Sequence, residues 1–168
     1  MKKAFDLRSP LASISASAGT WAAGNTSNVP SLGRSAQGAA SNVLTIPFLP
    51  SVPNVKDGKQ VGIRLRKVKA QFSVGVAALT QAPTIAVYKT SALGTAAPTA
   101  TALTGTLSGY TAATGNQVIT YDLAYLGEAL FDINSNFHAE LTVNPDTTTT
   151  IALYDVVFVY EVVENAQD

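Results

Sequence analysis

The residues best suited to chemistry form one basic stretch, RLRKVK, at residues 64–69. Arg64, Arg66, Lys67 and Lys69 make it the most densely charged run in the chain. Guanidinium and ammonium groups bind phosphates, but they bind the carboxylates of another protein surface equally well. Few aromatic side chains that could stack on bases lie nearby in sequence. We therefore expect these four residues to contact acidic groups, within the fold or on a partner, with a polyanion such as nucleic acid as a secondary hypothesis.

The single histidine and the scattered acids give little support to catalysis. His138 and Glu140 share the polar face of an alternating segment, without the nucleophile context that a triad requires. One His and no Cys cannot supply the usual ligands of zinc. Asp122, Glu128 and Asp132 would act as a glycosidase pair only in a cleft that raises the pKa of one of them. We expect a protein that is not an enzyme, with no cofactor and no small-molecule substrate.

A calcium loop is a second candidate for chemistry, at residues 132–136. Asp132, Asn134 and Asn136 alternate as the first oxygen ligands of such a loop do. Phe137 stands where the loop needs glycine, and Val143 where it needs glutamate. We interpret the segment as an Asx-rich turn before a strand and keep calcium binding as the alternative.

The charge content is low and unevenly distributed. Only 13% of residues are charged, against about 25% in an average soluble domain. Charge is depleted at interface cores, so an assembly component fits this composition, as does a Thr-rich soluble β-protein. All basic residues lie at or before Lys89 with only two acids, and nine acids follow, so the two parts carry net charges of +9 and −9. We expect these parts to meet within the fold or between subunits.

Residues 1–40 differ in composition from the rest of the chain. They are rich in Ser, Ala, Gly and Asn, and no helical or strand period persists through them. We predict an extended N-terminal arm over 1–40 and a β-sandwich domain over 41–168. The apolar residues of the arm that we expect at a subunit interface are Leu11, Ile14, Trp21 and Leu32.

No targeting or membrane segment is expected. Asp6, Arg8 and Pro10 interrupt the region that a secretory signal needs to be apolar. No run approaches the roughly 18 apolar residues of a membrane-spanning helix. Cysteine is absent, which excludes disulfides.

Alternation of apolar residues predicts long strands and one β-bulge. Ile63 and Leu65 are apolar at odd positions, whereas from Val68 to Val76 the apolar residues are at even positions. A period-two strand changes face only through an extra residue, so we predict a bulge near Arg66-Lys67.

The closing strand, roughly 150–163, is apolar on both faces. One face must cover the core, and the other needs a loop, the arm or another subunit. The residues that we expect on this second face, at a subunit interface, are Ile151, Leu153, Val157 and Val159.

Many strands, few helices and regular turn signals predict an all-β fold. We expect an antiparallel β-sandwich and favour a jelly roll, because the Cys–Trp–Cys pattern of antibody-type domains is missing.

The chain resembles the small single-jelly-roll capsid, decoration and cement proteins of phages and viruses. The features that carry this resemblance are the small-residue arm, the proline-broken segment NVLTIPFLPSV (42–52), the closing pair of strands over 137–162, the low charge and the absence of cysteine. The resemblance implies a structural virion protein, made in a host cytoplasm, that contacts itself and other capsid proteins. The alternative is a receptor- or carbohydrate-binding sandwich, such as a phage fibre tip, with its site in the loops around 93–115.

Overall fold

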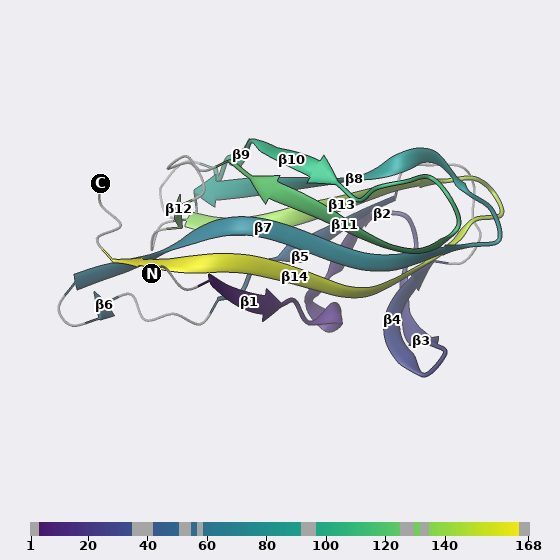
Figure 1. Cartoon of the computed structure of the whole chain (residues 1–168), viewed down its shortest axis with the longest axis horizontal. Helices are drawn as coiled ribbons and strands as arrows, with labels where there is room; N and C mark the ends of the chain where they lie inside the picture. Colours follow the sequence, from purple (N-terminus) through teal and green to yellow (C-terminus); the bar gives the residue numbers. More distant parts are fainter. Residues whose placement is uncertain are drawn as a thin grey trace.

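The computed structural model is an antiparallel sandwich of two sheets (Figure 1). It describes residues 4–34, 42–50, 55–56, 59–91, 97–124, 130–131 and 135–164. Within these ranges the chain is almost entirely strand, and its one helical turn is the 3-10 helix η1 (Leu11–Ser13). The all-β sandwich expected from apolar alternation is thereby confirmed.

Sheet A has nine strands. Its main order is β10-β11-β7-β14-β4-β3, while β1 also pairs with β14, and β6 and β12 pair with β7. The strands are β1 (Ala4–Arg8), β3 (Ala22–Thr26), β4 (Val29–Arg34), β6 (Val55–Lys56), β7 (Lys59–Gly75), β10 (Gly105–Ser108), β11 (Gly115–Leu123), β12 (Leu130–Phe131) and β14 (Thr150–Glu164).

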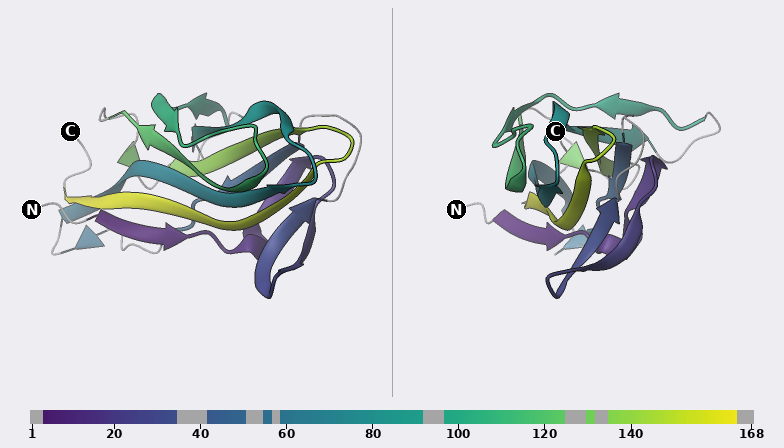
Figure 2. Two further views of the ribbon diagram at one scale, coloured as in Figure 1. Left: turned by 45° about the vertical axis from the view of Figure 1, so that its right-hand side comes forward. Right: turned by 90° about the vertical axis from the view of Figure 1, so that its right-hand side faces the viewer.

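Sheet B has five strands in the order β2-β5-β13-β8-β9. The strands are β2 (Ser15–Ala18), β5 (Asn42–Pro47), β8 (Leu79–Ser91), β9 (Ala100–Ala102) and β13 (Ser135–Pro145). The end-on view in Figure 2 shows the two sheets facing each other across the core.

The order of eight of these strands is that of a jelly roll. In sheet A, β14 lies between β4 and β7, and β11 lies outside β7. In sheet B, β13 lies between β5 and β8, and β9 lies outside β8. The last two strands of the chain are thus each inserted between two earlier ones, which gives two interlocked Greek keys.

The core is filled by alternate residues of both sheets. Phe48 joins the layers, because its ring centroid lies 5.0 Å from that of Phe158 in sheet A and 6.2 Å from that of Phe137 in sheet B. Phe72, Leu141 and many aliphatic side chains are fully buried in the same hydrophobic core.

The predicted bulge in the basic strand is confirmed. Along the β7–β14 ladder, Val159 pairs with Lys67 but Tyr160 pairs with Leu65, so Arg66 is the extra residue. Leu65 and Val68 are both buried because the bulge restores the inward direction of the apolar residues.

Most of the segment expected as an arm belongs to the two sheets. Within the described residues 4–34, β1 and β4 pair with β14, and β2 pairs with β5. Ile14 and Leu32 are part of the hydrophobic core, and Leu11 and Trp21 pack against it. The segment lacks a clear alternation because three of its strands, β1, β2 and β3, are short edge strands whose residues are mostly exposed. The predicted boundary after residue 40 falls outside the described residues.

Candidate functional site

The basic stretch lies on the outer face of sheet A. Ile63, Leu65, Val68 and Ala70 point into the core, so the alternate residues of β7 point outward. The bulge therefore places Arg64, Lys67 and Lys69 on the same face of the sheet, and Arg66 also contacts Glu161 on that face.

Acids from the second half of the chain meet these cations. Strand β7 lies between β11 and β14, both of which come after residue 90. Lys67 Nζ lies 2.7 Å from Asp122 Oδ1 on β11, and Arg66 Nε lies 3.9 Å from Glu161 Oε1 on β14. The partly exposed pair between Lys67 and Asp122 contributes about 0–1 kcal/mol. Arg66 and Lys67 thus have acidic partners on the neighbouring strands.

Two outward valines of β14, Val157 and Val159, form what we call the valine stripe. Both are only half-buried. On one side, Asp6 of β1 lies opposite Val159; on the other, Lys69 of β7 lies opposite Val157. Neither Asp6 nor Lys69 has an ion-pair partner within the described part of the chain.

A groove on the same face lies beneath the β3–β4 hairpin, and we call it the hairpin groove. The hairpin turns through Ser27 and Asn28, whose φ values are 51° and 66°. Positive φ at both central residues of a two-residue loop is the type I′ turn, which matches the twist of a hairpin. The hairpin projects from the body of the sandwich (Figure 1), and its end borders the groove.

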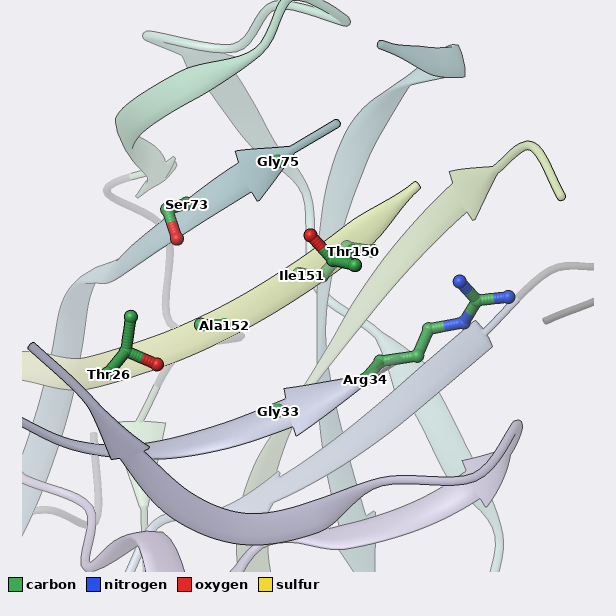
Figure 3. Close-up of a pocket in the computed structure, with 8 residues that line it drawn as sticks. All are labelled: Thr26, Gly33, Arg34, Ser73, Gly75, Thr150, Ile151 and Ala152. Atoms are coloured by element: carbon green, nitrogen blue, oxygen red, sulfur yellow. The ribbon is translucent and has the colours of Figure 1, made fainter. Parts of the chain in front are cut away.

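The inner part of the groove has a volume of about 380 Å³. Figure 3 shows its residues, which come from β3, β4, β7 and β14. Gly33, Ser73, Gly75 and Ala152 carry small side chains or none, which leaves this part of the sheet surface hollow. The hollow therefore depends on side-chain size as well as on the hairpin.

The outer part has a volume of about 480 Å³ and is strongly polar. Gln71, Asn116 and the ion pair between Arg8 and Asp155 line it. The remaining wall includes Tyr154, whose hydroxyl lies 2.8 Å from Ser73 Oγ. Apart from the paired Arg8 and Asp155, these lining side chains are uncharged.

Tyr154 reaches the groove because of a second bulge. In the β14–β7 ladder, Leu153 pairs with Phe72 and Asp155 with Gln71, so Tyr154 is an extra residue. Because of this bulge, the expected assignment of β14 residues to the second face is wrong for the first part of the strand. Ile151 and Leu153, expected on the second face, are buried in the core, because the parity of the strand changes after them. Two adjacent polar residues, Tyr154 and Asp155, between apolar neighbours are the sequence signal of this change.

Arg34 is a buried cation that lines the inner part of the groove. Its Nε donates to Asn42 Oδ1 at 3.0 Å and its Nη1 donates to the carbonyl oxygen of Thr149 at 3.0 Å. Burial lowers the pKa of the Arg34 guanidinium from its ordinary value. The side chain joins β4 to β5 and to the β13–β14 turn, so it supports the wall of the groove.

The other candidates for chemistry lie apart from this face. His138 stacks on Tyr88 on the outer face of sheet B, with ring centroids 5.1 Å apart. Asp132 and Asn134 of the calcium candidate, and Glu128 of the glycosidase candidate, lie outside the described residues. Elsewhere in the described chain, no three His, Asp or Glu residues are grouped as metal ligands. Its single helical turn is too short to cross a membrane, and no described helix is long and apolar enough.

Comparisons with known proteins leave the function open. No family model matches the sequence, and no curated protein matches it. Among solved structures, the chain is similar to a low-affinity xylan-binding module, CBM86, from the gut symbiont Roseburia intestinalis. The alignment covers 94% of each chain with 13% sequence identity and a TM-score of 0.33. A similarity of this size supports no conclusion, so the functional interpretation depends on the geometry of this chain.

Proposed function

We propose that this protein is a non-enzymatic structural subunit of a viral shell, as a capsid protein or a decoration or cement protein. The observation that carries the proposal is the valine stripe between Asp6 and Lys69, an acid and a base that have no ion-pair partner among the described residues. Fold alone does not assign function, but a charge-poor sandwich with such a surface has the chemistry of an assembly unit.

The stripe is suited to a contact with a second copy of the chain. Asp6 and Lys69 lie on opposite sides of Val157 and Val159 in the sheet register. A two-fold axis in the plane of the face would place each Asp6 against Lys69 of the other copy, with valines against valines. Such a contact is isologous, because the same patch serves both copies. It buries apolar surface and satisfies two charges at once.

The first test is the size of full-length protein in solution, measured by size-exclusion chromatography with light scattering. We expect dimers or larger closed oligomers, and negative-stain electron microscopy of concentrated protein should show particles. Recording absorbance at 260 and 280 nm tests the secondary hypothesis, because bound nucleic acid would dissociate at high salt. A protein that is monomeric at every concentration and forms no particles would overturn the proposal.

Charge reversal locates the contact. Asp6→Lys and Lys69→Asp should each weaken association, because each places like charges opposite one another, and the double variant should restore it. Val157→Asp should abolish association without disturbing the core, since the side chain points outward. The matched control is Thr84→Asp, at an exposed position on sheet B, which should leave the oligomer intact. If none of these substitutions changes the oligomeric state, the contact lies elsewhere on the molecule.

A further inference from the structure

We propose that the hairpin groove binds a short neutral oligosaccharide. The two adjoining hollows, about 380 and 480 Å³, are each within the range of about 300–1,000 Å³ that is typical of small-ligand sites. Thr26 and Ser73 line both of them. The site is therefore long enough for more than a single small group.

The polar groups of the outer hollow match sugar hydroxyls. Gln71 and Asn116 are exposed amides, each of which offers both a donor and an acceptor. A hydroxyl likewise donates and accepts, so each amide can form paired hydrogen bonds with neighbouring hydroxyls. Arg8 and Asp155 form an ion pair, which leaves further donors and acceptors without adding net charge to the groove.

Tyr154 supplies a partly apolar surface beside these polar groups. A tyrosine ring has an apolar body and a polar tip, which suits a sugar with both C–H and O–H faces. The hydrogen bond between Tyr154 and Ser73 holds the ring at the bulge before any ligand arrives. A fixed side chain loses little conformational freedom on binding.

Other classes of ligand fit the groove less well. An anion such as a phosphate would meet two cations that already have partners. Arg8 is paired with Asp155, and Arg34, which lines the inner hollow, donates to Asn42 and Thr149. An extended peptide that adds to a sheet needs an open strand edge, whereas the floor of the groove is the face of β7 and β14, whose backbones pair with each other. An uncharged polyhydroxylated ligand is the class that remains.

The test begins with full-length protein on an array of neutral and acidic glycans. The best neutral hit is then titrated into isotope-labelled protein by NMR. We expect shifts at Gln71, Asn116 and Tyr154, and roughly tenfold weaker binding in the double variant Gln71→Ala/Asn116→Ala, which loses two hydrogen-bonding groups. Tyr154→Phe, which keeps the ring, should weaken binding by less. Thr84→Ala, on the other sheet, is the control and should bind as the parent does.

Three results would overturn the oligosaccharide proposal. Absence of binding to any neutral glycan at millimolar concentration overturns the proposal, as does a preference for acidic glycans. Shifts confined to residues 109–114 would place a sugar site in the β10–β11 loop and equally overturn it. Circular dichroism of each variant shows whether a loss of binding reflects unfolding. Binding to the array is scored whatever the oligomeric state, so this proposal and the shell proposal can fail separately.

Discussion

The turn between β7 and β8 holds a valine in a conformation that valine disfavours. Val76 has a φ of 68°, and the amide of Ala77 donates to the carbonyl oxygen of Gly75 at 2.9 Å. A hydrogen bond across one central residue with positive φ defines the rare and strained form of the γ-turn. The Val76 side chain is 80% exposed, so burial does not offset the strain. Val76→Gly should therefore stabilise the fold.

The size of the effect follows from two opposing terms. A left-handed conformation costs an L-residue about 1–2 kcal/mol, and glycine removes that cost. Glycine also has more conformational freedom in the unfolded chain, which lowers the free energy of unfolding by about 0.5–1 kcal/mol. Because Val76 is mostly in solvent, little burial is lost. The net expectation is a stabilisation of about 1 kcal/mol, or a rise in Tm of about 2–4 °C for a chain of this length.

Urea and thermal denaturation, followed by circular dichroism, measure this difference directly. Val76→Ala should recover only part of the gain, since alanine keeps the Cβ that makes positive φ costly. Val118→Gly is the matched control, because Val118 is half-exposed within the regular strand β11, where glycine should destabilise. A Val76→Gly protein no more stable than the parent would refute the assignment of strain to this turn.

Other perturbations have equally definite outcomes. The amide of Thr148 donates to the Asp146 carboxylate, and this hydrogen bond is the main cause that holds the pKa of Asp146 below its ordinary value. The ionised carboxylate therefore stabilises the fold at neutral pH, and this stabilisation is lost as pH falls through the lowered pKa. Asp146→Asn should therefore lower the urea midpoint at neutral pH but not in strong acid; an equal loss at both would contradict this. Gly105→Ala would place a Cβ 2.5 Å from Tyr121 Cε1 and should cost about 1–3 kcal/mol in urea denaturation. Phe158→Ala, at a fully buried position, should cost about 3–5 kcal/mol in the same assay; losses below 1 kcal/mol would contradict either packing assignment.

Strong alternation made the central strands predictable from sequence. The exchange of odd for even apolar positions between Leu65 and Val68 has one structural solution, an extra residue, and Arg66 is that residue. The second bulge was missed because Tyr154 can be placed on an apolar face, so that Asp155 is its only polar interruption. The adjacent polar pair Tyr154-Asp155 is a weak signal, and the pairing of Asp155 with Gln71 shows that the parity has changed.

The N-terminal segment was harder to predict, for a physical reason. Strands β1 and β3 lie at the margin of sheet A, so most of their side chains are exposed on both faces, and no period-two burial selects their sequence. These strands are held by backbone hydrogen bonds, which do not depend on the side chain and so leave no pattern in the sequence. The hairpin groove was equally hidden, because its walls are brought together by the turn at Ser27 and Asn28 and not by any local pattern.

The unequal charge distribution is accounted for by the order of strands in sheet A. The basic strand β7 is placed between β11 and β14, and both of these come from the acidic part of the chain. Lys67 meets Asp122 on one side, while Arg66 meets Glu161 on the other. Arg8, from the first strand, likewise pairs with Asp155 of the last. Charges separated along the sequence are therefore interleaved in space, so the basic stretch needs no polyanion to explain it. Lys69 has no such partner in the described chain, and it is the cation of this stretch that we propose to contact a second copy.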